Sequence, residues 1–160
     1  MMIFVTVGWQ YGFERLVIKM DDIASKVDEE VVMQIGSTKY EPVNAQYFRF
    51  VETDDQILEY MRDARLVVSH AGAGSILTAS SLGKPTIIVP RLKKFGEHID
   101  DHQLEIAEVI SEDEGMFVVY DVGDLDEHVR EGRLNGHNRV RNPLLVKNLK
   151  KIIDQLTLGD

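Results

Sequence analysis

The chain has 160 residues, a length that predicts one domain over residues 1–160 with one sizeable core. Its 27 Asp and Glu outnumber its 18 Lys and Arg, and the net charge of −9 disfavours a free-standing nucleic-acid-binding protein. Because the sequence contains no cysteine, disulfide scaffolds, cysteine-ligated zinc sites and cysteine nucleophiles are excluded.

Short apolar runs alternate with segments whose apolar residues have helical spacing. In chain order we predict a strand at Ile3–Val7, a helix at Phe13–Lys26, strands at Val31–Ile35 and Tyr47–Val51, a helix at Asp54–Ala64, a strand at Leu66–Ser69, a helix at Ser75–Leu82, a strand at Thr86–Val89, a helix at His98–Ile110, a strand at Phe117–Tyr120 and a last helix after Pro143. Valine- and isoleucine-rich strands that alternate with helices indicate an α/β fold, a Rossmann-like parallel sheet with helices on both faces.

The sequence also predicts where the chain resides. The apolar run Met1–Val7 has no basic flank and breaks at Gly8, which argues against a signal peptide. No apolar run approaches the roughly 18 residues that a membrane-spanning helix needs. We therefore expect a cytoplasmic chain. The basic segment Arg130–Lys151 is either a solvated surface or a surface for an acidic partner or an anionic membrane.

The strongest local motif is the loop His70–Ser75, which joins a predicted strand to a predicted helix and contains Gly72 and Gly74. Glycines let the backbone approach a ligand, and the free N–H groups and dipole at a helix start favour an anion such as a diphosphate. Ser75 either caps the helix or donates to phosphate, and a tight turn without a ligand is the alternative. The loop fits neither the Walker motif nor the dinucleotide fingerprint, which needs a third glycine where Leu77 stands.

A second polar motif spans Gly96–Gln103. His98 and His102 would share one face of the predicted helix, but a metal site there needs a third ligand that we cannot place, so we predict no metal. The remaining readings are a polar helix start and the recognition of sugar hydroxyl groups. Five side chains offer the donors and acceptors for that recognition: Glu97, His98, Asp101, His102 and Gln103.

Two further groups of residues lie near these loops. Arg91, Lys93 and Lys94 follow the fifth predicted strand and either offset the charge of a diphosphate or form a solvated basic loop. Trp9 and Tyr11, in the loop after the first strand, either line a pocket or contact a partner. Both groups lie beyond the carboxyl ends of predicted strands, where open parallel sheets bind ligands.

Taken in order, these motifs resemble the C-terminal domain of family-28 glycosyltransferases. The matching segments are Ile3–Gly8 with Phe13–Leu16, Gln34–Gly36, Ser69–Ser75, Gly83–Pro85, Val89–Arg91 and Gly96–Gln103. The resemblance covers roughly residues 2–120 and extends to the two-part enzymes of that family. One branch of these half-enzymes adds GlcNAc to a dolichol-linked sugar, and a bacterial exopolysaccharide branch is more similar.

The resemblance implies the donor-binding half of a GT-B fold, with a UDP-sugar as donor substrate and no other cofactor. It implies a second, membrane-anchored subunit that binds the lipid-linked sugar acceptor, so that this chain is peripheral to the membrane through its partner. The last helix, in residues 143–160, would pack on that partner. Without the partner, its apolar stripe from Leu145 to Leu156 would be free to form a homo-oligomer.

The resemblance also implies roles for individual residues. It places Gly72, Gly74 and Ser75 at the diphosphate, Val51 near the uracil, and Asp101, His102 and Gln103 at the sugar hydroxyls. We add Gly8, His70, Arg91, Glu97 and His98 to the predicted binding residues. The wider GT-B pattern has a ribose-binding Glu five residues before the glycine that ends the helix, and this chain has Thr78 there, which we keep as a candidate.

The implied reaction is transfer of a sugar from UDP to a lipid-linked hydroxyl, with inversion. A helix N-terminus and basic groups stabilise the leaving diphosphate in such a reaction, and a general base activates the acceptor. His70 and His102 are the candidate bases near the donor, but a base from the partner or the Gly8–Gly12 loop stays open, so we leave it unassigned. The alternative functions are a non-catalytic nucleotide-binding or scaffold subunit and a nicotinamide enzyme.

Overall fold

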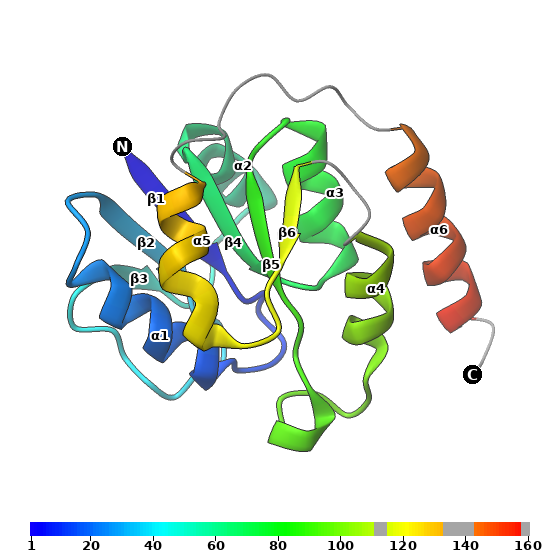
Figure 1. Cartoon of the computed structure of the whole chain (residues 1–160), viewed down its shortest axis with the longest axis horizontal. Coiled ribbons are helices and arrows are strands. Elements are labelled where there is room, and N and C mark those ends of the chain that lie inside the picture. The colour runs from blue at the N-terminus through cyan, green and yellow to red at the C-terminus, as the bar shows by residue number, and fades with distance from the viewer. Residues whose placement is uncertain (111–114, 133–142, 158–160) are drawn as a thin grey trace.

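The computed structural model describes residues 1–110, 115–132 and 143–157, except for the side chains of 143–146 and 156–157. It contains one six-stranded sheet with the order β3-β2-β1-β4-β5-β6, and every neighbouring pair is parallel (Figure 1). The strands are β1 (Met2–Thr6), β2 (Glu30–Gln34), β3 (Gln46–Phe48), β4 (Leu66–His70), β5 (Thr86–Val89) and β6 (Met116–Val118). The predicted Rossmann-like parallel sheet is confirmed.

The strand order reverses between β1 and β4, which lie side by side at the centre of the sheet. Ile3 of β1 aligns with Val31 of β2 on one side and with Leu66 of β4 on the other. After β1 the chain turns to one face of the sheet, and after β4 it turns to the opposite face. Because these two loops diverge, a crevice forms at the carboxyl ends of β1 and β4, which is where ligands of such sheets bind.

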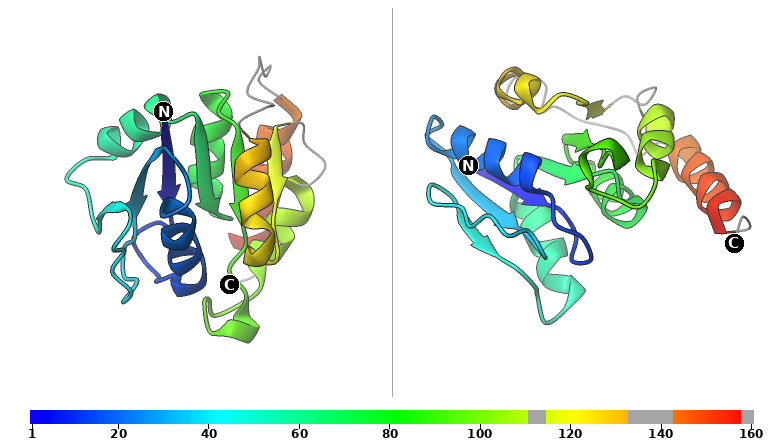
Figure 2. Two further views of the ribbon diagram at one scale, coloured as in Figure 1. Left: turned by 60° about the vertical axis from the view of Figure 1, so that its left-hand side comes forward. Right: turned by 90° about the horizontal axis from the view of Figure 1, so that it is seen from below.

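Helices cover both faces of the sheet (Figure 2). One face carries α1 (Glu14–Ala24) and α5 (Leu125–Glu131), and the other carries α2 (Asp54–Asp63), α3 (Ala73–Ser81), α4 (His102–Ile110) and α6 (Pro143–Thr157). Two 3-10 turns, η1 (Lys93–Phe95) and η2 (Val122–Asp124), follow β5 and β6. The side chains of β1 alternate between the faces, with Ile3 packed on the α1 side and Phe4 on the α2 side.

Three predicted boundaries are wrong by several residues. The third strand ends at Phe48, short of Val51, because Arg49 turns away and donates to the carbonyls of Gly36 and Thr38 at 3.1 and 2.6 Å. Helix α3 begins two residues before Ser75, and α4 begins at His102, four residues later than predicted. The segment before α4 folds into turns instead, so His98 and His102 do not share a helix face.

Helix α5 was not predicted. Its sequence is mostly charged, and only Leu125 and Val129 are both apolar and fully buried, one helical turn apart. Such a pattern gives no strong apolar stripe. The helix forms because those two side chains complete the core on the α1 side of the sheet.

The last helix packs on its own domain. Leu149 of α6 is fully buried among Ile106 and Ile110 of α4, and Ile152 lies at the edge of the same cluster. The side chains of Leu145 and Leu156, which the predicted apolar stripe includes, lie outside the described residues. Docking of this helix on a partner stays a prediction.

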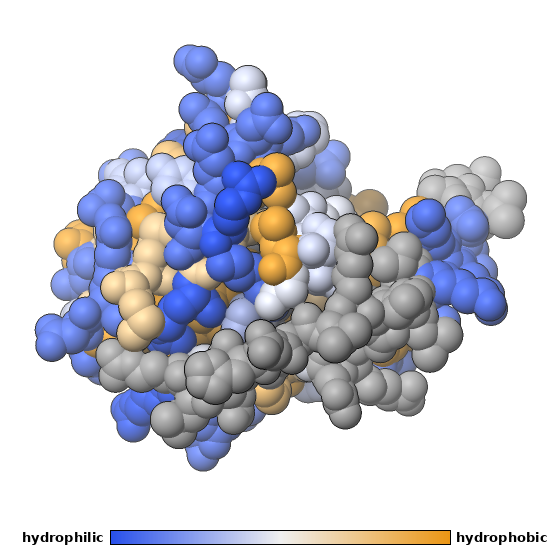
Figure 3. Space-filling view, turned by 90° about the horizontal axis from the view of Figure 1, so that it is seen from above, coloured by the Kyte–Doolittle hydropathy of each residue, from blue (hydrophilic) through white to orange (hydrophobic). Residues whose placement is uncertain are grey.

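Hydrophilic residues predominate among the described residues at the edge where the strands begin (Figure 3). Among the described residues, no helix has the length and apolarity that crossing a bilayer requires. The remaining features of interest lie at the opposite edge, where the strands end.

Candidate functional site

Two adjoining cavities open at the carboxyl ends of β1 and β4, the lower edge of the sheet in Figure 1. Their volumes are about 730 and 250 Å³. Both are lined by Gly8, Trp9, Gly74 and Ser75. A ligand that spans the two cavities must therefore lie against the loop after β1 and the first turn of α3.

The shared wall is built by the glycine loop. Gly72 precedes α3, and the first helical hydrogen bond runs from the N–H of Ile76 to its carbonyl, at 3.1 Å. The N–H groups of the first helical turn therefore have no partner within the helix. A Cβ placed on Gly74 would meet no atom within 4 Å, so this backbone is open to a ligand. An anion that bridges the cavities would accept from these N–H groups.

The larger cavity has an apolar wall and a partly exposed rim. Helix α2 contributes Ile57, Leu58 and Met61. The predicted residues Val51 and Thr78 also line this cavity, and the hydroxyl of Thr78 donates to the carbonyl of Gly74 at 2.9 Å. Trp9 and Phe50, which are 66% and 59% exposed, add aromatic surface. This composition suits a planar ring with polar edges.

His70 is held beneath the glycine loop. Its Nδ1 lies 3.4 Å from the carbonyl oxygen of Thr6, and a Cβ on Gly72 would lie 2.1 Å from its Nε2. Burial, with the nearby charge of Arg91, lowers the pKa of His70 to about 3. The ring is therefore neutral at physiological pH, and because a carbonyl only accepts, Nδ1 is its donor to Thr6.

Arg91 is placed behind the smaller cavity and is 2% exposed. Its guanidinium donates to the carbonyls of Val7, Tyr11 and Gly12, so it fixes the loop that follows β1. Its backbone N–H donates to the Gln103 side chain at 2.9 Å. Burial lowers the pKa of Arg91 to about 10, so the guanidinium stays positively charged at neutral pH. This charge lies beside the smaller cavity while the guanidinium stays hydrogen-bonded to the loop after β1.

The loop between β5 and α4 separates the predicted sugar-binding residues into two groups. His98 and Gln103 line the smaller cavity, as do His70, Gly72 and Arg91. Glu97, Asp101 and His102 line neither cavity. The Glu97 carboxylate accepts from Arg15 at 2.7 and 3.1 Å, and Asp101 accepts from the N–H of Lys93 at 2.9 Å. Both carboxylates therefore brace the loop.

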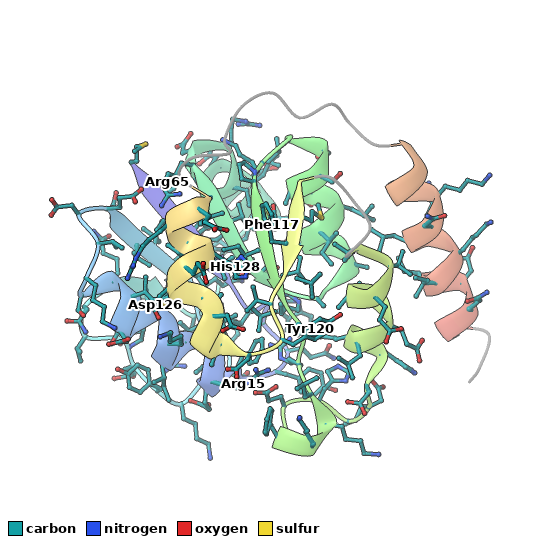
Figure 4. The ribbon with its side chains drawn as sticks, in the orientation of Figure 1. Arg15, Arg65, Phe117, Tyr120, Asp126 and His128 are labelled. Carbon is teal, nitrogen blue, oxygen red and sulfur yellow. The ribbon has the colours of Figure 1, made fainter. Side chains whose placement is uncertain are left out.

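Arg15 connects this loop to the rest of the fold. Besides pairing with Glu97, it donates to the carbonyls of Pro90 and Tyr120, at 3.1 and 2.9 Å, and its position beside Tyr120 is visible in Figure 4. Within the described part of the chain, no three His, Cys, Asp or Glu side chains gather as metal ligands would. The imidazoles of His98 and His102 contact Asp100 instead.

Several cavity residues escaped the sequence analysis. Phe50, Asp54 and Asp55 follow β3 and line the larger cavity, and Gln34, at the end of β2, does so too. Ligands bind beyond the carboxyl ends of strands, but the predicted third strand ran on to Val51, so this rule did not identify the residues that follow Phe48. Asp100 also escaped, because its contacts depend on the turns before α4.

One family model matches residues 2–156, and its description is glycosyltransferase family 28 C-terminal domain. The chain belongs to this family. The match confirms the resemblance and extends it to residue 156, beyond the 120 or so residues that the motifs cover.

Curated relatives carry transferase names. The UDP-N-acetylglucosamine transferase subunit ALG13 of Homo sapiens is 31% identical over 72% of this chain and 11% of its own length. ALG13 of Yarrowia lipolytica is 33% identical over 68% and 59%. A UDP-N-acetylglucosamine--N-acetylmuramyl-(pentapeptide) pyrophosphoryl-undecaprenol N-acetylglucosamine transferase of Cytophaga hutchinsonii is 30% identical over 75% and 32%. The family-28 domain thus spans less than two thirds of each of these relatives.

Solved structures share the fold. The glycosyltransferase of kitacinnamycin superposes with a TM-score of 0.63 at 18% identity, over 98% of this chain and 39% of that one. MurG of Acinetobacter baumannii gives 0.58 at 15% identity, over 94% and 49%. An ALG13 solution structure gives 0.60 at 19% identity, over 92% and 93%. The chain therefore has the fold of one half of a GT-B glycosyltransferase.

Proposed function

We propose that this family-28 domain is the donor-binding, catalytic subunit of a UDP-sugar-dependent glycosyltransferase. The observation that carries the proposal is the meeting of two cavities at the first turn of α3. In this arrangement the diphosphate accepts from the N–H groups of Ala73, Gly74 and Ser75, the uridine occupies the larger cavity near Val51, and the sugar occupies the smaller one.

The chain's own charges favour departure of the diphosphate. As the bond between the sugar and the phosphate breaks, negative charge grows on the leaving UDP. The start of α3 and the buried guanidinium of Arg91 are fixed positive groups beside that charge, and they need not reorient as it develops. His70, neutral and packed under Gly72, adds no competing charge.

We further propose that the chain works with a second subunit. The relatives called ALG13 are named as transferase subunits, and by analogy with them the acceptor-binding half would be a separate protein. The partner would be membrane-anchored, bind the lipid-linked sugar acceptor and hold this chain at the cytoplasmic surface. UDP-GlcNAc is the first donor to test, because the names of both groups of relatives specify it.

The single tryptophan provides the test. Trp9 lines both cavities and is the only Trp in the chain, so its fluorescence reports on ligands at either side of the shared wall. We expect saturable quenching or enhancement on titration with UDP, none with NAD, and a weaker response in Gly74→Asp, which places a carboxylate where the diphosphate binds. Lys94→Gln, which changes the net charge by the same single unit and lies outside both cavities, is the matched charge control.

The same titration separates a nucleotide-binding chain from a scaffold of this fold that binds no nucleotide. A scaffold would give no UDP response with the isolated chain or with the chain co-purified from membranes with its partner. An NAD response in place of the UDP response would instead support nicotinamide chemistry.

A further inference from the structure

The loop between β5 and α4 places an imidazole–carboxylate pair beside the smaller cavity. His98 lines that cavity with its side chain 18% exposed, and its Nδ1 lies 2.9 Å from Oδ1 of Asp100. Its ring also packs on the ring of Tyr11, with 4.8 Å between the centroids. The imidazole is therefore held by a carboxylate at one nitrogen and by an aromatic ring tilted at 53° to it.

Asp100 is itself held in place. Its Oδ1 accepts from the backbone N–H of His102 at 3.0 Å, and its Oδ2 lies 3.2 Å from Nδ1 of that histidine. Burial opposes ionisation, but the backbone hydrogen bond and the two imidazoles together keep the pKa of Asp100 below its usual range. An ionised carboxylate only accepts, so in the neutral imidazole of His98 Nδ1 carries the proton and Nε2 has a free lone pair.

The other two histidines at this edge lack that combination. His70 lines the same cavity, but its Nε2 lies directly under Gly72. His102 contacts Asp100 as well, yet it lines neither cavity and its side chain is 46% exposed. Among the described histidines, His98 alone unites a carboxylate partner with a place in the cavity wall.

We propose that His98 is the general base of the transfer reaction and that Asp100 is the residue that positions it; this rests on the proposed function. The acceptor O–H proton passes to Nε2 of His98 while the acceptor oxygen forms a bond to C1 of the sugar. The bond from C1 to the β-phosphate oxygen breaks, and its electron pair leaves with UDP. Asp100 stabilises the imidazolium that results.

Two different elements bring the residues for these two events to the smaller cavity. Gly72, Gly74 and Ser75 line it from the start of α3, where the leaving diphosphate would be stabilised. His98 lines it from the loop after β5, so a sugar bound there would be within reach of both groups. The proposed inverting displacement requires the acceptor and its base on the face of C1 opposite the leaving diphosphate.

Asp100→Asn separates the charge of this carboxylate from its orienting hydrogen bond. Oδ1 of Asp100 contacts both the His102 N–H and Nδ1 of His98, so an Asn oxygen at that place keeps the turn before α4 closed and still accepts from Nδ1 of His98. The amide nitrogen then replaces Oδ2, which faces Nδ1 of His102, and the negative charge that stabilises the imidazolium is lost. Ring-nitrogen NMR on the isolated chain should show His98 protonated at Nδ1 in the wild type and in the variant. Protonation of Nε2 in the wild type would overturn the proposal.

Activity is measured on membranes from cells in which the chromosomal copy is replaced by each variant, so that the partner and acceptor are present. The donor is the UDP-sugar that wild-type membranes incorporate into lipid, among UDP-GlcNAc, UDP-glucose, UDP-galactose and UDP-glucuronic acid. We expect His98→Gln to lower kcat by about 100-fold or more with the KM for the donor within about threefold, and Asp100→Asn to lower kcat in the same way.

His128→Gln is the matched control, because His128 lies on α5 next to Phe117, away from both cavities (Figure 4). It should retain wild-type kcat. Retention of more than a third of kcat by His98→Gln would overturn the proposal, as would a loss confined to KM. Absence of any UDP response at Trp9 would instead refute the proposed function, and the ring-nitrogen result would still decide whether the pair exists.

Discussion

Gly72 and Gly74 are two residues apart but meet different surroundings. A Cβ on Gly72 would lie 2.1 Å from Nε2 of His70, which is packed between this loop and Gly8 and has little room to retreat. We expect Gly72→Ala to lower the free energy of unfolding by about 1–3 kcal/mol and to weaken UDP binding. Urea denaturation and the Trp9 titration measure the two effects.

Gly74→Ala is the control for that substitution. Its Cβ meets no atom within 4 Å, and it lies inside α3, so we expect unchanged stability or a gain of about 0.5–1 kcal/mol. Equal stability losses in the two variants would mean that His70 does not restrict the loop.

Asp21 gives a pH-dependent contribution to stability. It is 1% exposed, and its carboxylate accepts from the Tyr40 hydroxyl and from the N–H groups of Val43, Asn44 and Ala45. Burial opposes its ionisation, but these hydrogen bonds prevail and hold the pKa of Asp21 below its usual value. Because the folded-state pKa is the lower one, the stabilisation is present above about pH 4 and is lost as the pH falls through the folded pKa.

We therefore expect Asp21→Asn to reduce stability at pH 7 and to flatten the loss of stability between about pH 4 and pH 2. Thermal unfolding across that range measures both. The Asp22 carboxylate is on the surface and pairs with Lys26, so Asp22→Asn should leave the loss of stability at low pH nearly unchanged. If Asp21→Asn loses stability between about pH 4 and pH 2 as steeply as the wild type does, another carboxylate is responsible.

At the scale of elements, α6 contributes to the core of the domain. Leu149 is fully buried where α6 packs against α4 and α3, so we expect Leu149→Ala to cost about 2–5 kcal/mol in urea denaturation. Lys150→Ala, at the next and exposed position, should change stability by less than about 0.5 kcal/mol. Equal midpoints for the two variants would place α6 away from the core.

This burial changes how partner docking has to be tested. Deleting residues 143–160 removes Leu149 from the core, so a lost interaction would not distinguish misfolding from a missing interface. Reversing the charges of the exposed Lys147, Lys150 and Lys151 leaves that packing intact. Loss of partner capture in the triple variant, with unchanged unfolding, is the result that would assign docking to α6.

The sequence predicted elements better than contacts. Strands such as Ile3–Val7 and Thr86–Val89 are short apolar runs, and periodicity identified them within a residue or two. The role of Arg91 was not readable, because its carbonyl partners lie 79 to 84 residues away in the chain. The same holds for Asp100, whose contacts exist only because His98 is in a turn rather than on the predicted helix.

The sequence predicted the part of the candidate site that backbone N–H groups form. It did not predict which side chains take part. Gly72, Gly74 and Ser75 were predicted because the free N–H groups of a glycine-rich helix start attract anions, and all three line the smaller cavity. Glu97 and Asp101 have the right chemistry for sugar hydroxyls, but the fold uses them to accept from Arg15 and from the N–H of Lys93. Only the three-dimensional arrangement distinguishes these two uses of a carboxylate.

At the scale of the whole molecule, apolar side chains are exposed near the cavities. Trp9, Phe50, Phe95 and Ile99 are 66%, 59%, 56% and 70% exposed. They come from the loops after β1, β3 and β5, at the edge where the strands end. Single exposed apolar residues are ordinary, but several at one edge form a surface suited to association with another protein. We expect the isolated chain to self-associate there.

Salt distinguishes this association from one through the lysines of α6. Two copies that each carry −9 repel each other, and about 0.1 M salt screens charges beyond roughly 10 Å, so apolar association should strengthen as NaCl rises. Sedimentation velocity at several salt concentrations measures this. Phe95→Ser with Ile99→Ser should restore the monomer, whereas Val43→Ser, which is 82% exposed and lies outside these loops on the segment bonded to Asp21 of α1, should not. Association that weakens with salt would instead indicate that Lys147, Lys150 and Lys151 pair with an acidic surface of a second copy.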